Sequence, residues 1–134
     1  MGPVCVTRAL GELAAAHDLV LVEGAGGLLV RYDEAGHTLA DMARMAIGVG
    51  SHVEVLVVVE PGLGTLNNTV LTMEALRVRD LPVLGVVVGS WPLVPDLASC
   101  CNVKEICRTS RPPPSSVFFP KAPRGTRPSC VRLR

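Results

Sequence analysis

The sequence predicts an α/β protein in which helices cover both faces of a parallel sheet, giving three layers. Short apolar runs of strand length alternate with segments of helical periodicity along residues 6–107. Strands separated by such helices are typical of βαβ units, whose strands run parallel. The apolar fraction of 49%, with only 3% aromatic residues, describes a globular chain rich in Val, Leu and Ala rather than a disordered one.

The first expected elements are a helix and a buried strand. Residues 6–17 are expected to be helical, because Leu10, Leu13 and Ala14 lie at helical spacing. The run 19–22 is the first expected strand, and it is apolar on both faces, as a buried parallel strand should be.

A polar loop at 31–37 separates this strand from the second expected helix. Thr38 is the expected N-cap of that helix, which ends at Ala46, and Asp41 lies near its positive end. Pro82 directly precedes the last strand, where its missing N–H matters least. The remaining expected elements are strand 53–59, helix 66–79, strand 83–88 and helix 96–107.

The composition changes at residue 107, which divides the chain into an α/β domain (1–107) and a tail (108–134). The net charge of +1 hides an asymmetry, because the domain holds all twelve acidic residues and the tail has seven basic residues and no acid. The tail is rich in proline and has no apolar period beyond 117–119, so it is expected to be disordered. It is either read out of frame in a GC-rich gene or a genuine basic segment that binds anionic partners.

The cysteines and the apolar runs also indicate in which cellular compartment the protein is expected. The five cysteines show neither zinc-ligand nor C-x-x-C spacing, so reduced thiols in helices are expected. The N-terminus lacks the features of a signal peptide, and no apolar run approaches the ~20 residues that span a bilayer. A cytoplasmic protein without membrane or nucleic-acid partners is expected.

The most informative motif lies where the run 19–22 ends. One carboxylate, Glu23, stands there, and a glycine-rich turn at 24–27 follows at once. In an open α/β sheet, ligands bind beyond the carboxyl ends of the strands. A carboxylate there can hold Mg²⁺, and backbone without side chains lets phosphate or carboxylate oxygens approach closely. The alternative is a solvent-exposed strand-end carboxylate before an ordinary turn.

A second segment, residues 61–69 (PGLGTLNNT), follows the run 53–59 and opens a helical pattern. Together with residues 22–30 (VEGAGGLLV), 38–41 (TLAD) and 85–91 (GVVVGSW), it resembles the ATP-dependent dethiobiotin synthetases, the ring-closing carboxylases of biotin synthesis. The order and spacing of these pieces fit that family across roughly residues 9–107, which is the middle of such an enzyme rather than the whole.

The resemblance implies an α/β fold of the P-loop NTPase type, here incomplete, and an ATP- and Mg²⁺-dependent reaction. In that reaction 7,8-diaminopelargonic acid is carbamated by CO₂ and the carbamate is phosphorylated by ATP. The second amine then displaces phosphate and closes the cyclic urea of dethiobiotin. The family binds the substrate carboxylate across a dimer interface, so a homodimer is also implied.

The resemblance also implies roles for individual residues. Glu23 matches the family's acidic Mg²⁺ ligand. The region near Gly64 is where a helix begins, and N–H groups with a helix dipole suit a carboxylate. The alternative interpretation of this segment is a helix cap with Thr65 as the N-cap, which is compatible with a functional role. The implied nucleotide-binding residues are Glu23, Gly24, Ala25, Gly26, Gly89 and Ser90, and the implied substrate-binding residues are Gly26, Gly64, Thr65 and Asn67. Glu23, Gly26 and Gly64 are expected to cluster at one edge of the sheet.

The sequence departs from the family in two ways. It contains no P-loop, G-x-x-x-x-G-K-[ST], because its only lysines, Lys104 and Lys121, do not follow glycine. The family's two lysines and its second metal-binding aspartate lie upstream of the matched region, so no catalytic residue is expected here and the chain should be inactive alone. In addition, Gly89 and Ser90 stand where many members have Asn and then Asp. Since the Asn amide reads adenine, the base preference is left open.

Two other interpretations compete with a dethiobiotin synthetase. One is a non-catalytic dimerising fragment or pseudoenzyme that keeps the dimer face and an anion site. The other is a relative of the MinD-like or cobyrinate-amidating P-loop proteins, which also place an acid and glycines after a strand. The combination of residues 62–67 with residues 23–27 favours the synthetase.

Overall fold

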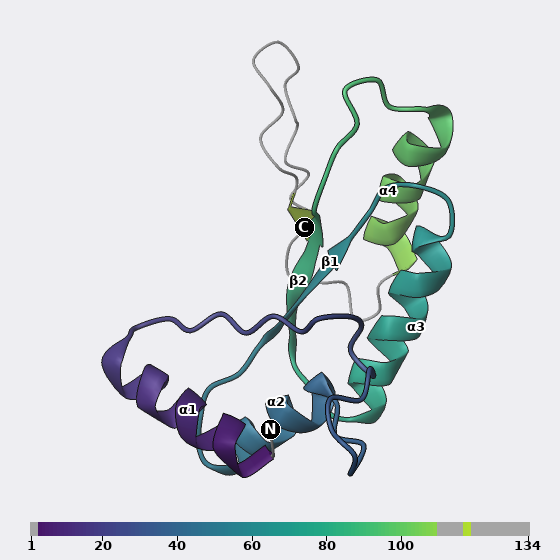
Figure 1. Ribbon diagram of the computed structural model, residues 1–134. Coiled ribbons are helices and arrows are strands. Elements are labelled where there is room, and N and C mark those ends of the chain that lie inside the picture. The colour runs from purple at the N-terminus through teal and green to yellow at the C-terminus, as the bar shows by residue number, and fades with distance from the viewer. Residues whose placement is uncertain (1–2, 110–116, 119–134) are drawn as a thin grey trace. The chain divides into compact units, whose positions relative to one another are not determined.

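The computed structural model describes residues 3–109 and 117–118 (Figure 1). The chain divides into two compact units, Met1–Val53 and Glu54–Arg134. The tail expected to be disordered, residues 108–134, lies outside the described residues except at 108–109 and 117–118. Within the described residues, no helix is both long and apolar enough to cross a membrane.

The first unit contains two helices, α1 (Pro3–Ala16) and α2 (Leu39–Gly48), which contact each other. Both helices were expected from the sequence. Between them the backbone is extended or turned, with one antiparallel bridge between Arg31 and Thr38. The buried apolar side chains of this unit are small, namely Ala40 and Ala46.

The predicted strand at residues 19–22 is wrong. No strand is assigned to this segment, and Leu19 and Leu21 are 74% and 84% exposed. A strand exists only through its hydrogen bonds to a neighbouring strand, and no described residue pairs with this segment. The apolar pattern indicates a tendency to be buried, but it does not show that a neighbouring strand is present to form hydrogen bonds with the segment.

The second unit is a parallel three-stranded sheet in the order β1-β2-β3. The strands β1 (Val55–Val59) and β2 (Val83–Val88) agree with the predicted runs. They pair from Leu56 with Gly85 to Val59 with Val88. The short strand β3 (Val117–Phe118), which was not predicted, pairs in parallel with β2.

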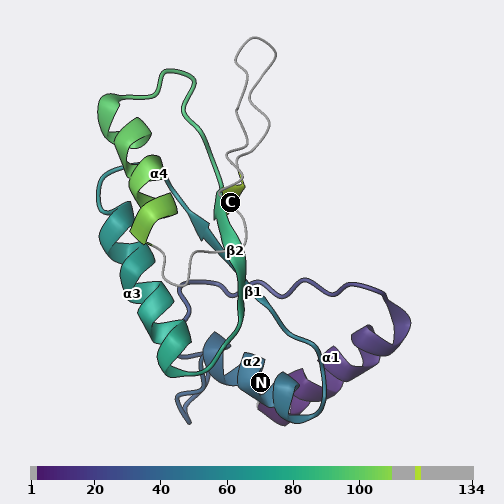
Figure 2. The same ribbon diagram turned by 180° about the vertical axis from the view of Figure 1, so that it is seen from behind.

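Two helices of the second unit, α3 (Thr65–Val78) and α4 (Leu97–Thr109), pack against each other, and α3 also contacts β1. Figures 1 and 2 show them on the same side of the sheet. Leu76 and Ile106, one from each helix, are among the most fully buried side chains. The core of this unit consists of Val57, Met73, Leu76, Leu81, Val86, Val88, Val103 and Ile106.

The expected helix layer on the second face of the sheet is not confirmed within the described part of this unit. On β1, Val57 is buried, whereas Leu56 and Val58, which point the other way, are 42% and 64% exposed. Right-handed crossovers that add strands in one direction place every helix on the same face. Helices reach the other face only where the strand order reverses, and β1-β2-β3 contains no reversal.

Candidate functional site

The carboxyl ends of β1 and β2 form one edge of the sheet. Val59 and Val88 are register partners, and the N–H of Gly89 donates to the carbonyl oxygen of Val59 at 2.9 Å. The loops that follow the two strands therefore start side by side. Of the predicted site residues, Gly64, Thr65 and Asn67 belong to the first loop and the helix it opens, and Gly89 and Ser90 belong to the second.

The loop between β1 and α3 ends in a left-handed turn that starts the helix. Gly64 is the N-cap of α3, with φ of 89° and no side-chain capping bond. Residues with a Cβ rarely adopt this φ, so glycine is favoured here. Gly64 and Asn67 are exposed. The first N–H groups of a helix have no intrahelical partner and lie at the positive end of its dipole, which suits an anion.

The alternative interpretation, in which Thr65 is the N-cap of α3, is wrong, because Gly64 takes that position. Thr65 is the first helical residue, is 6% exposed, and accepts a 2.6 Å hydrogen bond at its carbonyl from the hydroxyl of Thr69. The whole residue is buried, and its N–H donates to the carbonyl oxygen of Gly62 at 3.4 Å, so Thr65 itself offers little to an outside ligand.

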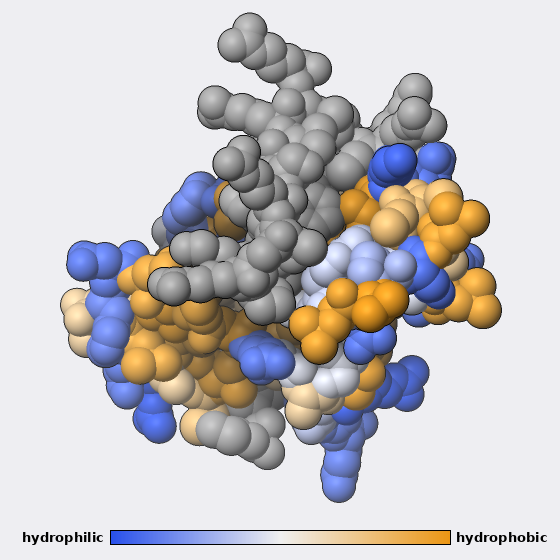
Figure 3. Space-filling view, turned by 90° about the horizontal axis from the view of Figure 1, so that it is seen from above, coloured by the Kyte–Doolittle hydropathy of each residue, from blue (hydrophilic) through white to orange (hydrophobic). Residues whose placement is uncertain are grey.

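The loops that follow the two strands carry exposed apolar side chains. Leu63 is fully exposed, and Leu93 and Val94, in the segment after β2, are 84% and 89% exposed. Figure 3, a view from above, shows hydrophobic surface in several places among the described residues. This edge of the sheet therefore has the N-terminus of α3 and exposed apolar side chains in its loops.

Asn102 was missed by the sequence reasoning. From α4, its side-chain Nδ2 donates to the carbonyl oxygens of Pro61 and Gly62 at 3.0 and 2.9 Å. It thus ties α4 to the loop that carries Gly64. No local sequence pattern predicts that an Asn about forty residues downstream contacts this loop.

In the first unit, the glycine-rich segment is irregular backbone. Gly26 has φ of 123°, and an added Cβ would lie 3.0 Å from Cγ2 of Val30. A Cβ on Gly24 would collide with the hydroxyl of Tyr32. Both positions therefore require glycine, for the turn and for close approach respectively.

Glu23 is exposed and has no hydrogen bond or ion pair among the described residues. No group of three or more His, Cys, Asp or Glu side chains close enough to hold a metal ion occurs in the described part of the chain. Mg²⁺ is usually held by one or two carboxylates, with phosphate and water completing its octahedron. Glu23 fits the role of one such ligand and does not make a complete site by itself.

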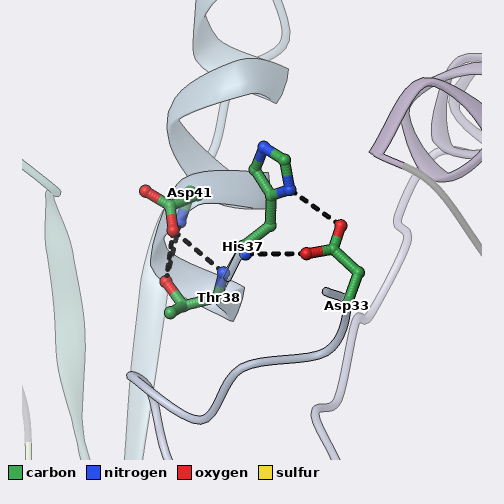
Figure 4. Close-up of polar contacts among 4 residues, drawn as sticks. All are labelled: Asp33, His37, Thr38 and Asp41. Atoms are coloured by element: carbon green, nitrogen blue, oxygen red, sulfur yellow. Dashed lines mark hydrogen bonds and ion pairs between the residues drawn. The ribbon is translucent and has the colours of Figure 1, made fainter. Parts of the chain in front are cut away.

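A second polar cluster precedes α2 (Figure 4). Asp33 accepts from the backbone N–H of His37 at 2.9 Å, and its other oxygen lies 2.7 Å from Nδ1 of His37. A carboxylate only accepts, so Nδ1 carries the proton. The backbone N–H of His37 is the main cause that lowers the pKa of Asp33 below its ordinary value.

The same cluster contains the cap of α2. The N–H of Thr38 and its hydroxyl both donate to the carboxylate of Asp41, at 2.9 and 2.7 Å, and the N–H of Asp41 donates to the hydroxyl of Thr38 at 3.3 Å. This reciprocal arrangement is a capping box. The predicted N-cap Thr38 is confirmed.

The predicted clustering of Glu23 and Gly26 with Gly64 stays a prediction. The first two residues belong to Met1–Val53 and the third to Glu54–Arg134. Each half of the predicted site is described within its own unit.

Comparison with known protein families matches residues 3–114 to the AAA domain family. The chain belongs to the AAA domain family. This membership, with the parallel sheet, agrees with the expected α/β fold of the P-loop NTPase type.

Several curated proteins that the chain resembles are ATP-dependent dethiobiotin synthetases. The one from Streptomyces avermitilis is 56% identical over 106 residues, which cover 79% of this chain and 42% of the relative. Those from Frankia casuarinae and Saccharopolyspora erythraea are 59% and 58% identical, over 72% and 78% of this chain. The resemblance inferred from the motifs is confirmed. The chain spans about two fifths of the length of these relatives.

Proposed function

We propose that the chain is part of a dethiobiotin synthetase, the ATP- and Mg²⁺-dependent enzyme that closes the cyclic urea of dethiobiotin from 7,8-diaminopelargonic acid and CO₂. The observation that carries this proposal is the identity of 56–59% to three such enzymes over most of the chain. The common edge from which the loops carrying Gly64 and Gly89 start supports it.

In this proposal the N-terminal turn of α3 anchors the remote carboxylate of the diamine. The exposed Asn67 side chain and the N–H groups near Gly64 and Thr65 supply the donors. Since this carboxylate does not react, its contacts hold the diamine in place while its amines react elsewhere. Because Thr65 is buried and its N–H donates to Gly62, this work falls to the other N–H groups of the first turn and to Asn67.

The nucleotide is assigned to two segments. Backbone at Gly24, Ala25 and Gly26 approaches the phosphates, and Glu23 is the ligand that would hold Mg²⁺, which neutralises charge on the transferring phosphoryl group. Gly89 and Ser90 border the base. Because Gly89 offers no side-chain amide, base selection rests on shape and on backbone contacts.

The remaining parts of the enzyme include a P-loop with its lysine, a second lysine and a second metal-binding aspartate. The 134 residues do not contain the P-loop motif. Phosphoryl transfer depends on positioning and on charge neutralisation at the β- and γ-phosphates. We therefore expect the chain alone to form no dethiobiotin, and we expect the active assembly to be a cytoplasmic homodimer. The competing function is a non-catalytic dimerising module, which the same missing motif favours.

A fusion experiment tests this proposal. The P-loop-bearing N-terminal part of the Streptomyces avermitilis relative is joined to residues 1–107, and dethiobiotin formation is measured with ATP, Mg²⁺, bicarbonate and the diamine. The intact relative and the unfused chain are the controls. We expect turnover by the fusion and none by the chain alone. A folded but inactive fusion beside an active relative would favour the non-catalytic module, and ring closure by the unfused chain would overturn the assignment of an indispensable P-loop.

A further inference from the structure

We propose that Asn102 is a positioning residue that holds the loop 60–64 in the conformation that directs the N-terminal amides of α3 towards the substrate carboxylate. The inference rests on the proposed function for the identity of the ligand. It rests on the structure alone for the role of Asn102 in fixing the loop.

The contact is specific in its chemistry. The side-chain NH₂ of Asn102 has two N–H donors, and its two acceptors are adjacent main-chain carbonyls, of Pro61 and Gly62. Both acceptors are oxygens, so only the nitrogen end of the amide fits there. Asn102 is partly buried, and hydrogen bonds shielded from water are worth more than exposed ones.

The loop needs such an external support. Pro61 has no N–H, and the only hydrogen bond from the loop's own backbone to Gly62 is a long one from the N–H of Thr65, at 3.4 Å. Gly62 and Gly64 add backbone freedom. The neighbouring Leu63 is fully exposed and makes no packing contribution.

The hydrogen bonds of Asn102 fix the loop that leads into the proposed anion site at the N-terminus of α3. The carbonyls of Pro61 and Gly62 lie three and two residues before Gly64, whose carbonyl accepts the first hydrogen bond of the helix from Asn68 at 3.1 Å. Fixing two consecutive peptide planes sets the direction from which the chain enters α3. It therefore sets where the unpaired N–H groups of the first turn point.

Two variants isolate this role. Asn102→Asp keeps the shape but replaces both donors by an acceptor that faces two carbonyl oxygens, and Asn102→Ala removes the donors without adding charge. Lys104→Ala, an exposed change on the same helix, is the matched control. Circular dichroism checks that each variant of the full chain is folded. If Asn102→Asp does not fold, Asn102→Ala alone is used for both measurements.

The first readout is amide hydrogen exchange by NMR. Losing two shielded hydrogen bonds should speed exchange at Thr65 and Asn68 by about ten-fold or more in both Asn102 variants, and Lys104→Ala should match the wild type. Unchanged exchange in a folded Asn102 variant overturns the proposal. An equal increase in Lys104→Ala overturns it as well.

The second readout is carboxylate binding, which a purely structural contact would leave unchanged. Nonanoate, a carboxylate on a hydrocarbon chain, is titrated against the full chain while the amide shifts of Gly64–Asn67 are followed. We expect about ten-fold weaker binding in the Asn102 variants and no change in Lys104→Ala. Faster exchange with undiminished binding overturns the proposed link to the ligand. If even the wild type binds no nonanoate, the carboxylate site of the proposed function fails, and the exchange data alone decide whether Asn102 fixes the loop.

Discussion

The backbone N–H of Gly89 lies 2.9 Å from the carbonyl oxygen of Val59 and donates to it. This bond continues the ladder between β1 and β2 by one residue beyond the last pair of strand residues. As a result, the loop after β2 leaves the sheet in contact with the end of β1. The segments proposed for the nucleotide base and for the substrate carboxylate start from this junction.

Gly89→Ala should destabilise the protein. The added Cβ would lie 2.8 Å from Cγ1 of Val58, a distance that forces the stiff valine or the backbone to move. We expect the free energy of unfolding, measured with urea, to fall by about 1–3 kcal/mol. Val58→Ala in the same background should recover part of the loss, because it removes the methyl group that collides.

Gly62→Ala is the control for this prediction. It lies in the same unit, and its Cβ would meet no atom within 4 Å. Its effect should stay within about 0.5 kcal/mol of the wild type. Equal stabilities of the two alanine variants would contradict the steric argument.

Thr38→Ala should lower the free energy of unfolding by about 1 kcal/mol, because it removes the capping hydroxyl of α2. Thr38→Ser keeps the hydroxyl and should cost much less. Combined with Asp41→Ala, the effect should be smaller than the sum of the single changes, since both remove the same reciprocal bonds. Strict additivity in the urea measurements would show that the capping box does not act as a pair.

The carboxyl of Asp33 should titrate below its ordinary pKa of 3.8. A pH titration of its side-chain carbon by NMR tests this expectation. The lowered pKa means that the native state favours the ionised form. This contribution to stability is therefore present above pH 3.8 and is lost as the pH falls through the native pKa. Asp33→Asn should remove this part of the acid dependence.

His37→Ala provides a finer test of the cause. The largest cause of the lowered pKa is the backbone N–H of His37, which the alanine variant keeps. The pKa of Asp33 should consequently rise only in part and remain below 3.8. A complete return to the ordinary value would assign the effect to the imidazole instead.

The sequence predicts those elements whose signals are local. Thr38 with Asp41 three residues later is a local capping pattern, and the helix begins where it predicts. The apolar run 83–88 behind Pro82 coincides with β2, which is the middle strand of the sheet and is mostly buried. In both cases the residues that decide the structure are neighbours in the chain.

The wrong predictions concern places where contacts between segments distant in the sequence determine the structure. The run 19–22 has the composition of a strand, but a strand also needs a neighbouring strand to pair with. Composition does not determine which segment that is. Thr65 has the side chain of an N-cap, yet the left-handed Gly64 takes that position and packing buries the threonine. The contact of Asn102 with Pro61 and Gly62 spans about forty residues and leaves no trace in local sequence.

In the fusion described above, Asn67→Ala and Glu23→Gln should separate the two halves of the proposed site. Asn67 would bind a carboxylate that is present equally in the ground and transition states, so its loss should raise KM for the diamine by about ten-fold and spare kcat. Glu23 would act where charge develops on the transferred phosphoryl group, so Glu23→Gln should lower kcat by about a hundred-fold. Both side chains are exposed, so thermal unfolding should be unchanged. Steady-state kinetics with varied diamine would contradict the carboxylate anchor if Asn67→Ala lowered kcat at unchanged KM.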